Sequence, residues 1–168
     1  MPDIEKLTNG YRCPRYGEWP AIPLYMDQVM LVMEGVLQPF AEQEERVITP
    51  TMINNYVKQK YVDPPSKKKY GREHLAALFV VSLLKKVLSM QEIQRVMFLL
   101  TAAWGSEAAY DLFCERLEAA MAQAFEKDSA LFALPAGTAP HEVVLNAAVV
   151  ALVSKLVVQQ TIARAAEE

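Results

Sequence analysis

The chain has 168 residues, of which 52% are hydrophobic and 22% are charged, and its formal net charge is −3. This composition is typical of a globular domain and excludes a disordered or fibrous protein. Two cysteines are too few for the disulfide framework of a small secreted protein, so we expect free thiols and a cytoplasmic location. Cys114 lies in an apolar helical pattern and is expected in the core, whereas Cys13 lies in an irregular segment and is expected at the surface.

The first 22 residues contain neither a periodic pattern nor the apolar run of a signal peptide. We expect residues 1–22 to form an extended arm that lies over the core. Apolar residues then recur at helical spacing from Leu24 to Phe40, which predicts a first helix. The stretch AEQEER that follows is expected to be a charged linker.

Thr49-Pro50 is a start signal for a second helix, because threonine caps the first turn and proline is tolerated at its first position. The helix should run to about Lys60 and end before Pro64-Pro65. One face of this helix is apolar. The opposite face is wholly polar and consists of Thr51, Asn54, Asn55 and Lys58.

Asparagine is disfavoured inside helices, because its side chain competes for backbone hydrogen bonds. Its amide can pair with the N6/N7 edge of adenine, and lysine can reach guanine or phosphate. This polar face is therefore either a base-contacting surface or an ordinary solvated face.

A basic turn follows the second helix. Between Tyr56 and Arg72 there are six basic residues and one acid, although the chain as a whole is acidic. The run Lys67-Lys68-Lys69 sits at the turn itself. Such a local patch can meet a polyanion, and the alternative is a turn that only aids solubility.

The rest of the chain also reads as helical. Gly71 precedes REHLAALFVVSLLKKV, which is apolar on most of its circumference, and Ser89 with Glu92 forms a capping-box pattern for a helix that starts at Met90. Gly105-Ser106 should end that helix.

A further helix is expected from Glu107 to about Lys127, and a last one from near Pro140. Between them we expect a loop with Leu131-Phe132 as an apolar plug. No stretch alternates with a period of two, so the predicted fold class is all-α.

The segments TPTMINNYVKQKYVDPP, KKKYGREHL and LFVVSLLKKVLSMQEI resemble the DNA-binding unit of MerR-type regulators. The positions that match that family's pattern are Tyr56, Pro64-Pro65, Lys68, Tyr70, Leu75, Leu78 and Ser89–Ile93. Asn54 and Asn55 depart from it, because they replace an arginine and a tyrosine. The wing is several residues short, the glycine before the closing motif is missing, and the first helix is longer.

Together with LYMDQV at 24–29, the same segments are similar to the bacterial family called domain of unknown function 1836, described as helix-turn-helix. This resemblance covers roughly residues 20 to 105. It implies an arm (1–22), a MerR-like helix-turn-helix domain with a truncated wing (23–104) and a helical dimerisation or effector region (105–168).

The resemblance also implies a homodimeric transcription regulator that binds double-stranded DNA through the second helix, 50–60, in the major groove. The residues expected to hold phosphates are Lys60, Lys67, Lys68, Lys69, Tyr70 and Arg72. The alternative function is a helical protein–protein interaction module that has the same shape and does not bind DNA.

The segment Val143–Val158 is shorter than a bilayer requires and contains Asn146 and Lys155, so we do not expect a membrane span. It is either a central core helix or a dimer interface, and the sequence leaves both open. Methionines at helical spacing are core residues first; a pocket for an unidentified small-molecule effector is the second interpretation.

Nothing in the sequence favours catalysis. His74 is expected at the surface or near a phosphate, and His141 at a helix start. We find no metal-ligand spacing, no Gly-rich phosphate loop and no nucleophile motif. We therefore expect no enzyme activity, no cofactor and no metal.

Overall fold

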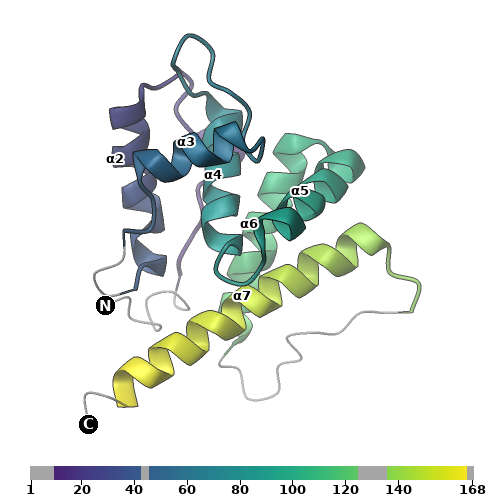
Figure 1. The fold of residues 1–168 in the computed structure, drawn as a ribbon. Helices are drawn as coiled ribbons and strands as arrows, with labels where there is room; N and C mark the ends of the chain where they lie inside the picture. The colour runs from purple at the N-terminus through teal and green to yellow at the C-terminus, as the bar shows by residue number, and fades with distance from the viewer. Residues whose placement is uncertain (1–9, 43–45, 125–135, 166–168) are drawn as a thin grey trace.

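The computed structural model describes residues 10–42, 46–124 and 136–165. Figure 1 shows the arrangement of the helices. In chain order they are the 3₁₀ turn η1 (Tyr16–Glu18), α2 (Met26–Leu37), the 3₁₀ turn η2 (Gln38–Phe40), α3 (Pro50–Lys58), α4 (Arg72–Leu84), α5 (Met90–Trp104), α6 (Ser106–Gln123) and α7 (Pro140–Ala165). No strand occurs in the described ranges, and the all-α prediction is confirmed at that level.

Helix α4 is the centre of the molecule. It is apolar on most of its circumference, and it packs against α2, α6 and α7. Phe79 of α4 is fully buried, and its ring packs edge-on against Phe40, and also against Trp19 and Tyr110. One hydrophobic core therefore runs across residue 104, where the sequence suggested a domain boundary.

The helix ends follow the local signals in the sequence. Thr49 Oγ1 accepts a hydrogen bond from Met52 N at 3.2 Å, which caps α3. Ser89 and Glu92 form the reciprocal capping box of α5. Gly105 separates α5 from α6 with a φ of 79°, a value that glycine adopts without steric cost. Helix α6 ends at Gln123, earlier than the predicted end near Lys127. The plug predicted at 131–132 lies outside the described residues.

The described part of the arm, residues 10–22, lies against α6 and α4, as predicted. The Tyr110 hydroxyl donates to Pro14 O at 2.7 Å, and Tyr16 N donates to Asp111 Oδ1 at 2.8 Å. Cys13 was expected at the surface and is fully buried. A hydrogen bond with Cys114 and desolvation raise the pKa of the Cys13 thiol. The expectation of a surface position for Cys13 was wrong, because the arm places this residue against α6.

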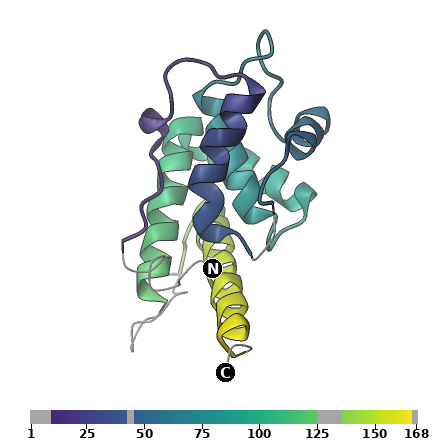
Figure 2. The same cartoon turned by 90° about the vertical axis from the view of Figure 1, so that its left-hand side faces the viewer.

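Helix α7 has 26 residues and packs along α5 and α6. Its C-terminal end projects beyond the other helices (Figures 1 and 2). By length and composition residues Pro140–Ala163 are the one described segment that passes as a membrane span, a test that a core helix of a soluble protein also passes.

Candidate nucleic-acid interface

Helix α3 is amphipathic in the sense that the sequence predicted. Ile53 and Tyr56 are buried against the core. The four residues of the predicted base-facing surface are all exposed to solvent: Thr51, Asn54, Asn55 and Lys58. The polar face of the helix is therefore accessible over its whole length.

Helix α3 ends at Lys58, two residues before the predicted end. Lys60 adopts a φ of 62°, which turns the chain out of the helix. The backbone N–H groups of Tyr61 and Val62 then donate to Tyr56 O at 2.8 and 3.3 Å. Val62 is buried, so the connection that leads to the basic turn is anchored to the core.

The basic turn is a two-residue hairpin loop. Ser66 N donates to Lys69 O at 3.1 Å, and Lys69 N donates to Ser66 O at 2.9 Å. The two central residues, Lys67 and Lys68, have φ of 49° and 64°. Positive φ at both central positions is the pattern of a type I′ turn, in which Asn-Gly is preferred. Each lysine there costs roughly 1 kcal/mol or more in backbone strain.

Two residues that follow the hairpin, Tyr70 and Arg72, are held by hydrogen bonds to other parts of the chain. Tyr70 pairs with Leu24 through two backbone hydrogen bonds of 2.9 Å, and its side chain is only 4% exposed. Arg72 is half-buried, and its Nε donates to Trp19 O at 2.9 Å. Tyr70, predicted as a phosphate ligand, is therefore a core residue, and Arg72 is tied to the arm.

His74 also differs from expectation, because it is buried and not at the surface. Its Nδ1 accepts from Gly71 N at 2.9 Å, which leaves the proton on Nε2, 3.3 Å from Pro64 O. The Glu73 carboxylate lies 3.1 Å from Nδ1. The ring therefore joins the start of α4 to the segment that leads into the hairpin.

One residue at this surface was missed by the sequence reasoning. Tyr25 precedes α2 and is 51% exposed, and Lys69 Nζ lies 4.9 Å from the centroid of its ring. This cation–π contact holds Lys69 in place beside the hairpin. Its only trace in the sequence is an aromatic residue at a helix start, and nothing in the spacing connects position 25 to position 69.

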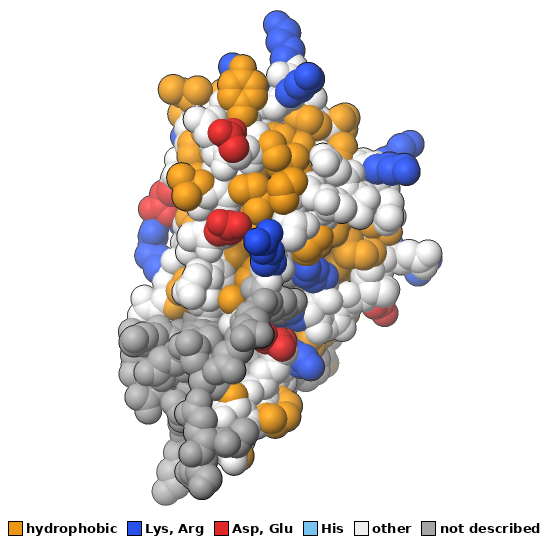
Figure 3. Space-filling view, turned by 60° about the vertical axis from the view of Figure 1, so that its left-hand side comes forward, with side chains coloured by type: hydrophobic (Ala, Val, Ile, Leu, Met, Phe, Trp, Pro, Cys, Tyr) orange, Lys and Arg blue, Asp and Glu red, His pale blue; other side chains and the backbone are white. Residues whose placement is uncertain are grey.

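Helix α3 and the 66–69 hairpin lie at the same end of the molecule in both ribbon views (Figures 1 and 2). Lys and Arg side chains gather at this end, over the hairpin, in Figure 3. Among the described residues, Lys58, Lys60, Lys67 and Lys68 are exposed, and no ion pair with an acid is found for them. We call Thr51, Asn54, Asn55, Lys58, Lys60 and Lys67–Lys69 the α3–hairpin surface.

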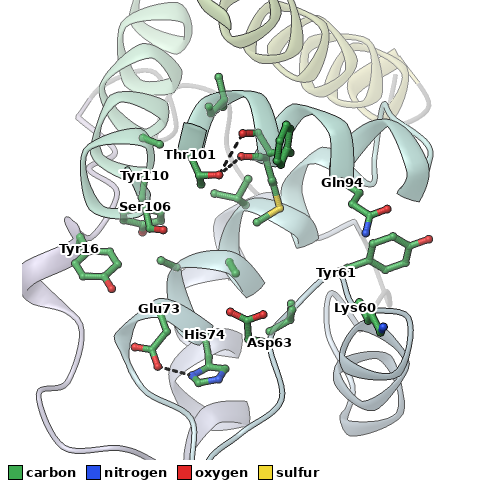
Figure 4. A pocket seen from close by; sticks show the side chains of 18 residues that line it. Tyr16, Lys60, Tyr61, Asp63, Glu73, His74, Gln94, Thr101, Ser106 and Tyr110 are labelled. Atoms are coloured by element: carbon green, nitrogen blue, oxygen red, sulfur yellow. Dashed lines mark hydrogen bonds and ion pairs between the residues drawn. The ribbon is translucent and has the colours of Figure 1, made fainter. Parts of the chain in front are cut away.

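A pocket of about 390 Å³ lies between residues 60–63 and the helices α4, α5 and α6 (Figure 4). Asp63, Glu73 and His74 line one side of it, and Tyr61 and Gln94 lie at the other. A cavity of this volume is large enough for a small molecule. Within the described ranges, no three His, Cys, Asp or Glu side chains are grouped to hold a metal ion.

The comparison with known proteins gives one family. The sequence model of a family described as a domain of unknown function, DUF1836, matches residues 14–113. The matched segment begins in the arm and ends in α6, so it contains the whole α3–hairpin surface. No curated protein and no solved structure matches the chain.

Proposed function

The chain belongs to the DUF1836 family, whose description names no activity, and from this premise we propose that it is a DNA-binding transcriptional regulator. Helix α3 enters the major groove of double-stranded DNA with its polar face towards the bases. The hairpin lysines and Lys60 bind the backbone phosphates. Phosphate contacts supply affinity and orientation, while side chains on the helix read the sequence.

The observation that carries this proposal is that exposed polar side chains and a strained basic turn lie at the same end of the molecule. Four polar side chains of α3 face solvent, and the neighbouring turn keeps two lysines in a backbone conformation that favours glycine. Strain that a fold retains is often connected with function. A phosphate backbone gives this strained turn a purpose, because both lysines at its tip are exposed to solvent.

Chemistry assigns different roles to the two parts of the surface. Asn54 and Asn55 can each form paired hydrogen bonds with adenine, which discriminates against other bases by about 1–3 kcal/mol. Lysine contacts to phosphates are independent of sequence and release counterions. Four such contacts, from Lys60 and Lys67–Lys69, give a log–log salt slope of about −3 to −4.

The MerR resemblance supports the same arrangement of a capped helix and a short wing. A single recognition helix reads few base pairs, so regulators of this kind act as symmetric dimers on half-sites about one helical turn apart. The pocket beside residues 60–63 is the proposed place for an effector, because the same residues lead directly into the hairpin.

The test is a selection of bound duplexes from a random pool of about 30 base pairs. We expect an enriched motif with two inverted half-sites whose centres are about 10 base pairs apart. A variant with Asn54→Ala and Asn55→Ala should retain DNA binding and lose the enrichment. Failure of the wild-type protein to retain any duplex at low salt contradicts the proposal.

A second candidate function is a protein–protein interaction module. It is favoured by two exposed apolar side chains: Ile22, at the end of the arm, is 76% exposed, and Leu31, within α2, is 75% exposed. Apolar residues of this kind suit a protein partner better than DNA. If Ile22→Ser and Leu31→Ser abolish function in the cell while DNA binding is absent, this second candidate is preferred.

A further inference from the structure

The two cysteines of the chain meet in the core although they are far apart in the sequence. Cys13 belongs to the arm and Cys114 to α6, and both side chains are fully buried. The two thiols share a hydrogen bond. Cys114 Sγ also lies 3.9 Å from the carbonyl oxygen of Pro14, the residue that follows Cys13. The packing of the arm on α6 therefore places two thiols side by side.

The backbone of Cys13 is held at the same turn of α6. Cys13 N donates to Glu118 Oε1 at 2.6 Å, and Glu118 follows Cys114 by one helical turn on the same face. The Arg15 guanidinium donates to Cys13 O at 3.1 Å and to both Glu118 carboxylate oxygens at 2.7 Å. Because the backbone is fixed beside Cys114, a small movement of the side chains brings the sulfur atoms to the roughly 2 Å separation of a disulfide.

The closed arm protects these thiols from reaction. Burial and the hydrogen bond raise the pKa of the Cys13 thiol, and a protonated thiol is a poor nucleophile. An oxidant therefore reaches the pair when the arm lifts from α6. Within residues 10–22 the 3₁₀ turn η1 is the only helical element, so hydrogen bonds to α6 side chains carry much of the attachment. Segments of this kind open locally at a lower free energy than the whole molecule.

We propose that Cys13 and Cys114 are a redox modification site, at which a small-molecule disulfide oxidises the pair and fixes the arm on α6. When the arm opens, the Cys13 thiol loses its proton to water and the thiolate attacks one sulfur of the oxidant, whose S–S bond breaks and releases one thiol. When the arm closes, the deprotonated Cys114 attacks the Cys13 sulfur of the mixed disulfide and releases the second thiol. Two protein thiols are oxidised to one disulfide, and one disulfide oxidant is reduced to two thiols.

The disulfide changes the properties of the arm. It closes a loop of about 100 residues, which restricts the unfolded chain and stabilises the folded one. Trp19 O of the arm accepts a hydrogen bond from Arg72 Nε at 2.9 Å, so a fixed arm also holds the start of α4. Disulfides of cytoplasmic proteins are usually transient and respond to the redox state, which suits a pair that is protected while the arm is closed.

The test incubates the reduced full chain with oxidised glutathione at about pH 8, near the pKa of an unburied thiol, and follows the products by mass spectrometry. The wild-type protein should lose the mass of two hydrogen atoms, and digestion should give a peptide pair joined through Cys13 and Cys114. Its midpoint of urea unfolding should rise by about 1 M and return when a thiol reductant is added. Cys114→Ser should stop at a mixed disulfide of Cys13 with glutathione.

The rate of the reaction tests the role of the arm. Glu118→Gln removes the charge that holds Arg15, so the arm opens more often and the disulfide should form roughly 10-fold faster. Glu115→Gln is the matched control, because Glu115 lies on the exposed side of the same helix and its loss should leave the rate unchanged.

Three results overturn the proposal. The first is a wild-type protein that keeps both thiols for about a day, well beyond the minutes to hours of uncatalysed exchange. The second is a product that carries glutathione or links two chains and has no bond between Cys13 and Cys114. The third is an internal disulfide that leaves the urea midpoint unchanged. Since no step of this test contains DNA, its failure is separate from a failure of DNA binding.

Discussion

Two polar regions of this protein use their side chains in opposite ways. In the arm, Arg15 and Glu118 form two hydrogen bonds of 2.7 Å, and Arg12 pairs with Glu18. On the α3–hairpin surface, Lys67 and Lys68 point from a strained turn and have no acid partner among the described residues. The charged groups of the arm form hydrogen bonds with α6 and within the arm, whereas those of the α3–hairpin surface are exposed and can contact an external partner.

The largest predicted effect lies in the core beneath the arm. Phe79 contacts Trp19 of the arm and Phe40 of the segment before α3. Replacing Phe79 by alanine should cost about 3–5 kcal/mol of unfolding free energy, because it leaves a cavity in the core between Trp19 and Phe40. Phe98→Ala is the control, since that ring is 71% exposed and should change the unfolding free energy by less than about 1 kcal/mol. Urea titration measures both variants, and equal effects would mean that Phe79 is not the core residue that its contacts indicate.

The arm should depend on its ion pair. Glu118 also accepts a hydrogen bond from Cys13 N at 2.6 Å, and both charged side chains are about four-fifths buried. Glu118→Gln should destabilise the protein by about 2 kcal/mol, between the values for surface and buried pairs. Glu115→Gln, on the exposed side of the same helix, should have almost no effect. If the two variants unfold at the same urea concentration, the ion pair does not anchor the arm.

The same pair predicts a pH dependence. Desolvation raises the pKa of Glu118, but the hydrogen bonds from Arg15 and Cys13 N outweigh it, and the pKa lies below its ordinary value. A lowered pKa in the folded state adds stability above the unfolded pKa of about 4.3, and this stability disappears as the pH falls through the folded value. The difference between wild type and Glu118→Gln should therefore be complete at pH 7 and shrink below about pH 4. A difference that grows on acidification would contradict this assignment.

Substitutions on the α3–hairpin surface should change DNA binding and leave stability almost unchanged, in contrast to substitutions in the arm. Asn54→Ala and Asn55→Ala remove exposed amides, so their effect on unfolding should stay within about 0.5 kcal/mol. Their effect on binding should be a loss of about 1–3 kcal/mol of base discrimination for each contact. Competition between the selected duplex and a scrambled one measures this loss. Unchanged discrimination would remove the asparagines from the base-reading role.

The smallest predicted effect is on the stability of the hairpin turn, and it separates the role of the two lysines in folding from their role in DNA binding. Changing the turn to Lys67→Asn with Lys68→Gly supplies the residues that a type I′ turn prefers. The double variant should be more stable by about 1 kcal/mol, because relief of the backbone strain at both positions is partly offset by the greater freedom of glycine in the unfolded chain, and it should bind DNA more weakly. A variant that is less stable than the wild type would show that the lysines contribute to the fold.

Local signals in the sequence were sufficient for the helices and for one face of the site. Thr49, Ser89 and Gly105 act on the residues next to them, so the helix limits near them could be predicted. The exposure of Asn54 and Asn55 followed from helical spacing alone. Lys60 was misjudged as helical, because its left-handed conformation is set by the connection to Val62 and not by its own preference.

Predictions failed where a tertiary contact decides the environment. Tyr70 is buried where its backbone pairs with Leu24, and His74 is buried between Pro64 and the ring of Tyr70. Arg72 is engaged because the arm brings Trp19 O within 2.9 Å. The contacts of Tyr70 and Arg72 have no local sequence pattern, since their partners Leu24 and Trp19 lie about 50 residues earlier in the chain.

The most direct measurement of the central claim is the salt dependence of duplex binding, followed by fluorescence anisotropy. For the wild-type protein we predict a log–log slope of about −3 to −4, and for Lys67→Ala with Lys68→Ala a slope smaller in magnitude by about 2. Arg46→Ala with Lys155→Ala removes two exposed charges elsewhere and should leave the slope unchanged. A slope that the hairpin variant does not alter would contradict the assignment of the α3–hairpin surface to DNA.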